Sequence, residues 1–145
     1  MKPLIKSVAK VLVINEKKEV LILTIGEYKS HPEKSFTPDL PGGIVDPGET
    51  ELVAVRRELQ EEAGITLPEE AFTLAYTKTE FYPEKTKSVT KFLYLTRLDK
   101  TPDVAISWEH ADFHWVPLEK LKTEIELRPF YREAIDYCFA SGMLS

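Results

Sequence analysis

The stretch GIVDPGETELVAVRRELQEEAGI, residues 43–65, sets the local structure around which the rest of the chain is arranged. Glycine permits close backbone approach and positive φ, so its first half predicts a tightly folded turn. Its second half predicts a helix over 51–63, with Thr50 as the N-cap and Gly64 at the C-cap position. The apolar residues that repeat at helical spacing on one face are Leu52, Val55, Leu59 and Ala63. A glycine-rich turn therefore leads directly into an amphipathic helix.

Three glutamates crowd one side of this helix. At about 100° per residue, Glu58, Glu61 and Glu62 fall within an arc of about 100°, beside the apolar stripe. Like charges at this spacing destabilise a helix, and carboxylates in its last turn oppose the macrodipole. Arg57 can reach Glu61, but one guanidinium cannot neutralise three carboxylates. The cluster is either a solvated acidic face or the seat of a hard cation, Mg²⁺ or Mn²⁺, which prefers oxygen ligands.

Strands and helices alternate in the rest of the chain. The runs KVLVIN (10–15) and EVLILTI (19–25) predict a hairpin of well-buried strands. The polar stretch 26–38 predicts a surface loop, and loops of this length are usually functional. Further strands are expected at residues 72–81, 88–98 and 113–117, and helices at 118–122 and 128–140. Because a short hairpin joins antiparallel strands, we expect an α/β fold of the α+β kind, not an all-parallel sheet.

Length and charge narrow the class of protein. The chain has 145 residues and no repeat or compositional break, which predicts a single domain over 1–145. A net charge of −5 gives no overall positive field for nucleic acid or an anionic membrane. The apolar run Val11–Ile14 is too short for a signal-peptide core or a membrane span, and the single Cys138 fits a reducing compartment. We expect a cytoplasmic monomer or homodimer whose partners are small molecules.

The spacing within residues 43–65 resembles the signature of a known family. Gly43, five residues, Glu49, seven residues, Arg57-Glu58 and the run LQEEAGI are similar to a complete Nudix box. That box marks hydrolases that act on a nucleoside diphosphate linked to another moiety. The same stretch is not a triphosphatase P-loop, because Glu49 stands where the P-loop has lysine. The resemblance implies a Nudix-like α/β/α sandwich with a mixed sheet and a metal-dependent hydrolase.

The resemblance also implies roles for the residues of the box. Glu58 or Glu62 would help to activate the attacking water, Arg57 would hold the carboxylates, and Glu49 would support the site from beside it. The alternative for Arg57 is a simple surface ion pair, which contributes little. The implied ligands of Mg²⁺, or of Mn²⁺ in its place, are Glu58, Glu61, Glu62 and the backbone carbonyl of Gly43.

Outside the box, the run SWEHADFHWVP (107–117) holds one further candidate. Glu109 is expected to supply the base or another metal ligand, with a solvated loop as the alternative. His110 and His114 have a spacing that suits zinc only on a helix, and residues 113–117 are expected to be a strand. They are therefore predicted to be ordinary surface or rim histidines.

Aromatic and basic residues offer weaker indications of the substrate. Three aromatic residues could stack on a nucleobase, although packing is the more common role: Phe81, Tyr82 and Trp108. Four loop lysines could meet phosphates, although loop lysines often only interact with solvent: Lys29, Lys34, Lys85 and Lys87. In the Nudix family a tyrosine seventeen residues after the box hints at dinucleoside polyphosphates, and a proline eighteen residues after it hints at ADP-ribose. Tyr82 and Pro83 fill both positions, so neither substrate is favoured.

The expected reaction is cleavage of a pyrophosphate linkage in a nucleoside diphosphate derivative. Candidate substrates are ADP-ribose, a nucleotide sugar and a dinucleoside polyphosphate. One alternative is a nucleoside triphosphate pyrophosphatase of the MutT type, which cleans the nucleotide pool. A second is a regulatory module that binds nucleotides without catalysis. An isoprenyl-diphosphate isomerase is excluded, since it needs a cysteine near the site and Cys138 is expected on the inward face of the last helix.

Overall fold

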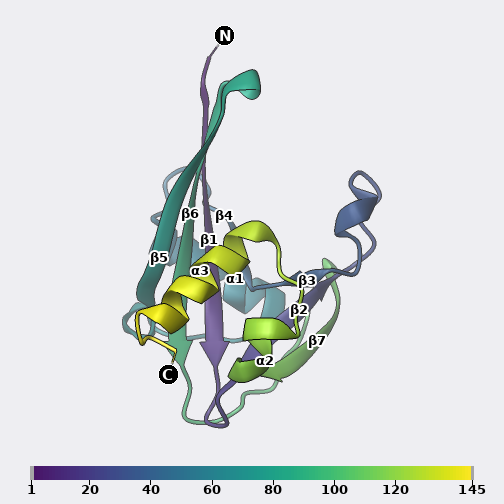
Figure 1. Cartoon of the computed structure of the whole chain (residues 1–145), viewed down its shortest axis with the longest axis vertical. Coiled ribbons are helices and arrows are strands. Elements are labelled where there is room, and N and C mark those ends of the chain that lie inside the picture. Colours follow the sequence, from purple (N-terminus) through teal and green to yellow (C-terminus); the bar gives the residue numbers. More distant parts are fainter. Residues whose placement is uncertain (1, 145) are drawn as a thin grey trace.

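The computed structural model describes residues 2–144 and shows one sheet with helices on both faces (Figure 1). Each strand pairs with at least one other through backbone hydrogen bonds. Its strands are β1 (Leu4–Ile14), β2 (Glu19–Ile25), β3 (Pro38–Asp39), β4 (Gly42–Ile44), β5 (Thr73–Tyr82), β6 (Lys87–Arg97) and β7 (His110–Pro117). Its helices are α1 (Glu51–Ala63), α2 (Leu118–Thr123) and α3 (Pro129–Ala140), with short 3₁₀ turns at Pro32–Lys34, Glu69–Ala71 and Pro83–Lys85.

The sheet is mixed, as the resemblance to the Nudix family implies, and it is not all-parallel, as the hairpin predicts. Its main path runs β3-β2-β1-β6-β5, while β4 pairs with β1 and β7 pairs with β2. The strands β1 and β6 are parallel along the whole of β1, and the other pairs are antiparallel. The long central strand β1 therefore has neighbours on both sides, which explains its continuous apolar run.

Alternate side chains of β1 enter two separate cores. Leu12 and Ile14 pack in the core that α2 and α3 cover. Val11 and Val13 pack on the opposite face, in the core covered by α1. Since successive strand residues point to opposite faces, one buried strand serves both layers. The α/β/α sandwich is thereby confirmed.

The helix limits agree closely with the sequence predictions. Helix α1 spans the predicted residues, with the Thr50 hydroxyl accepting a hydrogen bond from the Val53 N–H at 3.2 Å. Gly64 ends the helix with a φ of 70°. Helix α3 begins at Pro129 with Arg128 as its N-cap, one residue later than predicted. None of the helices in residues 2–144 is long and apolar enough to cross a membrane.

Two strands are longer than predicted and two short ones were not predicted. Strand β1 begins at Leu4 and not at Lys10, because its exposed first residues pair with β6 and need no apolar run. Strand β7 begins at His110 and not at residue 113. The strands β3 and β4 lie in Pro- and Gly-containing segments, which have low strand propensity.

Candidate active site

The glycine turn is pressed between β1 and α1. Gly42 has a φ of 135°, and a Cβ built there would lie 2.1 Å from the Ala9 carbonyl oxygen. A Cβ on Gly43 would lie 2.9 Å from the carboxylate carbon of Glu58. At Gly42 no side chain fits against the β1 backbone, whereas at Gly43 a Cβ would press on the Glu58 side chain. The turn therefore places the Gly43 backbone against one of the three glutamates.

Arg57 joins the carboxylates of the box. Its Nε and Nη2 donate to the two carboxylate oxygens of Glu49 at 2.7 and 2.8 Å. Its Nη1 donates to Glu58 at 3.1 Å and to Glu61 at 3.2 Å. The hydrogen bonds from Arg57 lower the pKa of Glu49 to about 2. Arg57 is thus the centre of a network and more than a simple surface ion pair.

Glu62 is the buried member of the cluster. It is 3% exposed, and its Oε1 accepts a hydrogen bond from the Gly42 N–H at 3.0 Å. Burial raises its pKa to about 8, against the opposing effect of the Lys10 ammonium and with a further increase from the Glu58 charge. A carboxylate in this position gains from any additional cation that reaches it.

A cavity of about 690 Å³ opens beside the cluster and collects most of the predicted site residues. Glu58, Glu61, Glu62 and Gly43 line it from the box. Glu109 lines it from the segment before β7, as expected for an outside contributor. Glu49 and Arg57 do not line the cavity and lie behind the carboxylates that do. The geometry thus divides the predicted residues into an inner and a supporting group.

The chemical types of the donor groups around the cavity suit a hard divalent ion. Carboxylates and a backbone carbonyl are the oxygen ligands that Mg²⁺ and Mn²⁺ take. Among residues 2–144, however, no three His, Cys, Asp or Glu side chains converge closely enough to hold an ion as they stand. Arg57 holds Glu58 and Glu61, and the Gly42 N–H holds Glu62. All three carboxylates line the cavity, and each is held there by a protein donor.

A second cavity, of about 550 Å³, continues the first towards the β5–β6 hairpin, which extends past the helices in Figure 1. The two cavities share Val8, Lys10, Lys34, Ile44 and Arg128. Its cationic lining residues are Lys6, Lys10, Lys34, Lys87, Lys91 and Arg128. The acid that lines it, Glu80, is paired with Lys91 at 2.6 Å. Together the cavities form one groove, which we call the bipolar groove, acidic at one end and basic at the other.

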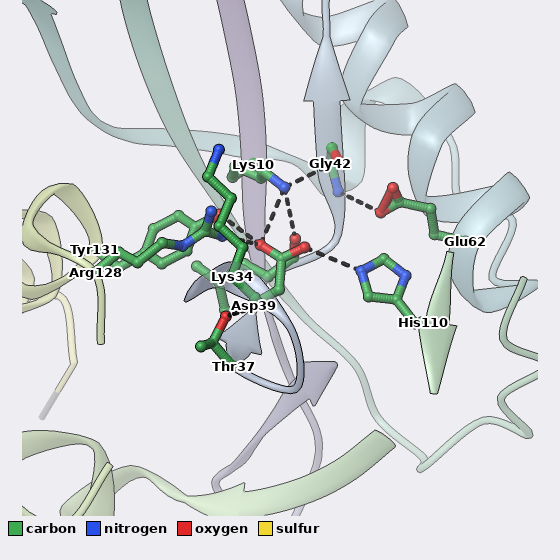
Figure 2. A network of polar contacts seen from close by, with 10 residues as sticks. Lys10, Lys34, Thr37, Asp39, Gly42, Glu62, His110, Arg128 and Tyr131 are labelled. Carbon is green, nitrogen blue, oxygen red and sulfur yellow. Dashed lines mark hydrogen bonds and ion pairs between the residues drawn. The ribbon is translucent and has the colours of Figure 1, made fainter. Parts of the chain in front are cut away.

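Asp39 forms a buried polar network under the middle of the groove (Figure 2). Its Oδ1 accepts from Lys10 Nζ at 3.2 Å, from the Tyr131 hydroxyl at 2.7 Å and from Arg128 Nη2. Its Oδ2 is bonded to His110 Nε2 at 3.0 Å. Burial alone would raise the pKa of Asp39, but Lys10, His110 and Arg128 hold it well below its usual value. The ionised carboxylate ties β1, β3, β7 and α3 together.

The prediction for one of the two histidines was wrong. The His110 side chain is only 4% exposed and is bonded to Asp39, so it is neither a surface nor a rim residue. It stands at the start of β7, where the strand enters the fold and the side chain turns towards the groove floor. His114 is exposed as predicted and pairs with Asp112 at 3.2 Å.

Packing is the wrong interpretation for two of the aromatic residues. Trp108 is 91% exposed and Phe81 is 63% exposed. Trp108 lines the acidic end of the groove, and Tyr82 lines the basic end. Of the four loop lysines, Lys34 and Lys87 line the groove, while Lys29 and Lys85 line neither of the two cavities.

Comparison with known proteins agrees with this arrangement. The family model described as the NUDIX domain matches residues 4–138. The chain belongs to the Nudix family. The Nudix box of this member consists of β4, the following turn and α1, and Glu58, Glu61 and Glu62 of α1 line the groove.

Individual relatives share both sequence and fold. An asymmetrical bis(5'-nucleosyl)-tetraphosphatase from Caenorhabditis elegans is 39% identical over 90 residues, which cover 62% of this chain and 64% of the worm enzyme. The crystal structure of a MutT protein from Methanosarcina mazei Go1 is 28% identical, with a TM-score of 0.81 and 98% of both chains covered. A Caenorhabditis elegans Ap4A hydrolase structure is 30% identical, with a TM-score of 0.65, and covers 94% of this chain and 97% of its own.

Proposed function

We propose that this Nudix protein is a metal-dependent pyrophosphohydrolase that cleaves a nucleoside diphosphate derivative, and that its substrate is a dinucleoside polyphosphate. The bipolar groove carries this proposal. A row of cations beyond the glutamate cluster offers room for a phosphate chain longer than a diphosphate. The asymmetrical tetraphosphatase from the worm, the 39% identical relative, acts on a substrate of that class.

The two ends of the groove suit the two nucleosides of such a substrate. Trp108 and Tyr28 line the acidic end, and Tyr82 lines the basic end. Aromatic faces stack on nucleobases with little preference between bases. A nucleoside triphosphate has one base and would leave one of these ends without a partner. The geometry therefore favours the dinucleoside substrate over the MutT-type alternative.

The chain's own residues would prepare the reaction. A divalent ion, Mg²⁺ with Mn²⁺ as the alternative, would lower the pKa of the attacking water and neutralise charge on the phosphates. Glu58, Glu61, Glu62 and the Gly43 carbonyl would hold it, while Arg57 orients the first two carboxylates. Glu109 is exposed at the cavity wall and is the proposed base for the water. Lys34 and Lys87 would hold phosphates that are not cleaved.

A substrate panel tests the proposal. Purified protein is incubated with a dinucleoside tetraphosphate, ADP-ribose, a nucleotide sugar and nucleoside triphosphates, with Mg²⁺, with Mn²⁺ and with EDTA, and products are separated by chromatography. We expect the highest kcat/KM for the dinucleoside tetraphosphate and no turnover in EDTA. Higher efficiency with a nucleoside triphosphate would favour the pool-cleaning function. Nucleotide binding with no metal-stimulated turnover would favour the regulatory module.

The proposal also includes the compartment and the oligomeric state of the protein. Cys138 is free and buried against the core beneath α3, which agrees with a reducing compartment such as the cytoplasm. A monomer or homodimer acting on a small nucleotide remains our expectation. Size-exclusion chromatography with light scattering would distinguish the two states.

A further inference from the structure

Lys10 lines the groove, yet its ammonium group has no hydrogen left for a substrate. A lysine ammonium has three N–H donors. Lys10 Nζ donates to Asp39 Oδ1 at 3.2 Å, to the Leu40 carbonyl at 3.1 Å and to the Gly42 carbonyl at 3.1 Å (Figure 2). Its side chain is only 13% exposed. A phosphate could bind Lys10 directly only by displacing one of these three partners.

Lys34 and Lys87 differ from Lys10 in this respect. In the described part of the chain, no carboxylate lies within ion-pair distance of either ammonium group. Each ammonium instead lies over an aromatic ring, that of Lys34 at 5.8 Å from the Tyr28 centroid and that of Lys87 at 5.6 Å from the Tyr82 centroid. Their N–H donors are available to an anion in the groove. Lys34 and Lys87 can therefore bind an anion, whereas Lys10 is already fully engaged.

The partners of Lys10 lead directly to the glutamate cluster. Lys10 binds the Gly42 carbonyl, and the N–H of the same Gly42 donates to Glu62 Oε1 at 3.0 Å. Lys10 and Gly42 are also register partners in the β1–β4 ladder. Gly42 is thus held on one side by the lysine and on the other by the buried glutamate. The next residue, Gly43, carries the carbonyl that is the proposed metal ligand.

We propose that Lys10 is a positioning residue of the metal site and not a phosphate-binding residue. It fixes the Gly42–Gly43 turn, and through it the Glu62 carboxylate, and it places a positive charge next to the buried acids while no metal is bound. Asp39 assists by holding the ammonium from the other side. This inference rests on the proposed function, because it takes Gly43 and Glu62 as metal ligands.

Three single variants test the inference by two readouts. Lys10→Met removes the three donors, Lys34→Met removes a free groove cation, and Lys120→Met removes an exposed cation on α2 that lines neither cavity. The first readout is the affinity of the substrate-free protein for Mn²⁺, from the electron paramagnetic resonance signal of the free ion. The second is the salt dependence of kcat/KM for a dinucleoside tetraphosphate.

The expected pattern separates positioning from phosphate binding. Lys10→Met should weaken Mn²⁺ binding by about 10–100-fold, the usual effect of removing a group that orients metal ligands, with an unchanged salt slope. Lys34→Met should bind Mn²⁺ normally and show a shallower salt slope, because one phosphate contact is lost. Lys120→Met should match the unchanged protein in both readouts. Lys10→Arg keeps the charge and donors and should recover most of the Mn²⁺ affinity.

Controls distinguish a variant that does not fold, and a failure of the proposed function, from a failure of the inference about Lys10. Thermal unfolding identifies folded variants, and Lys10→Gln, which keeps a polar group, replaces Lys10→Met if that variant does not fold. A folded Lys10 variant that binds Mn²⁺ like the unchanged protein overturns the inference, whether or not its salt slope changes. If the unchanged protein binds no Mn²⁺, the proposed function falls and the inference falls with it. If it binds Mn²⁺ and turns over substrate while Lys10→Met is normal, only the inference falls.

Discussion

Glu62 is a buried carboxylate whose charge is compensated only in part. Its Oε1 accepts a hydrogen bond from the Gly42 N–H, while burial and the neighbouring Glu58 favour its protonated form. Its pKa is raised from 4.5 to about 8 in the folded protein. The metal-free fold is therefore most compatible with a neutral Glu62 and loses stability as the pH rises from about 4.5 to about 8.

Glu62→Gln should separate stability from activity. The amide keeps an oxygen for the Gly42 N–H and removes the buried charge, so the metal-free variant should equal the unchanged protein near pH 4.5 and exceed it by about 1–3 kcal/mol at pH 8. Metal-dependent turnover should fall by orders of magnitude. Urea unfolding in EDTA at several pH values, together with kinetics, measures both.

The exposed neighbour provides the control for this prediction. Glu61→Gln should change stability little, because Glu61 is solvated, while it also weakens metal binding. A Glu62→Gln variant that is less stable at pH 8, or that keeps normal turnover, would contradict the role assigned to Glu62.

Arg57 acts through geometry as well as charge. Arg57→Lys keeps the positive charge but cannot bind both oxygens of Glu49 and also reach Glu58 and Glu61. We expect a loss of about 10–100-fold in kcat/KM at fixed metal concentration. The matched control is Arg56→Lys, since Arg56 is exposed and bonds the Leu67 carbonyl. Equal activities of the two variants, measured by initial rates, would show that charge alone suffices.

The sequence predicted the residues of the box and missed the network beneath them. Glu58, Glu61 and Glu62 share one helix, so their spacing alone shows that they are neighbours. Asp39 finds its partners 29 to 92 positions away, and only folding brings them together. One signal was present: Lys10 directly precedes the apolar run Val11–Ile14, and a charge next to buried residues requires a partner.

At the scale of elements, β4 couples the sheet to α1. The adjacent glycines Gly42 and Gly43 should respond differently to substitution by alanine. Gly42→Ala would place a Cβ 2.1 Å from the Ala9 carbonyl oxygen at a φ of 135°, so we expect it to lower stability by about 3 kcal/mol or more. In Gly43→Ala the three heavy atoms nearest the new Cβ all belong to the movable Glu58 carboxylate, the closest at 2.9 Å, so the variant should fold well and lose activity by displacing that ligand.

Thermal unfolding measures the stability of the two glycine variants, and initial rates measure their activity. Gly48→Ala is the control for a positive φ alone, because Gly48 has a φ of 87° and nothing within 4 Å of a Cβ. An active Gly43→Ala variant would contradict the close packing of the turn on Glu58. A stable Gly42→Ala variant would contradict the tight contact with β1.

The accuracy of the element predictions depends on the kind of local signal. Helix α1 was predicted to the residue because Thr50 and Gly64 mark its two ends. The start of β1 was missed because residues 4–8 are held by pairing with β6 and none of them is fully buried. The strand β4 was missed because its position follows from contact with β1 and not from its own residues.

At the scale of the molecule, an acidic protein presents a basic groove end. The net charge is −5, yet Lys6, Lys34 and Lys87 gather with few acids beside the glutamate cluster. The sandwich could be predicted from alternating strands and helices and from the box, because those patterns are local. The groove could not, since it forms where β1, β6 and the start of α3 meet.

The groove predicts a salt effect on the reaction. At 0.1 M salt, the electrostatic attraction between phosphates and exposed lysines is largely screened beyond about 10 Å. We therefore expect kcat/KM for a dinucleoside tetraphosphate to fall as the salt concentration rises. The double variant Lys34→Met/Lys87→Met should have a higher KM and a flatter salt dependence. Initial rates at several NaCl concentrations measure this, with Lys29→Met/Lys85→Met as the charge-matched control. An equal slope for both double variants would contradict the role of the groove.

The glycine turn and the three glutamates are proposed to form a divalent metal site. The most direct test is anomalous X-ray diffraction from crystals soaked in Mn²⁺. We expect a manganese peak within about 2.0–2.4 Å of carboxylate oxygens of Glu58, Glu61 or Glu62 and near the Gly43 carbonyl. No peak at this position in crystals saturated with Mn²⁺, or a peak only elsewhere, would contradict it.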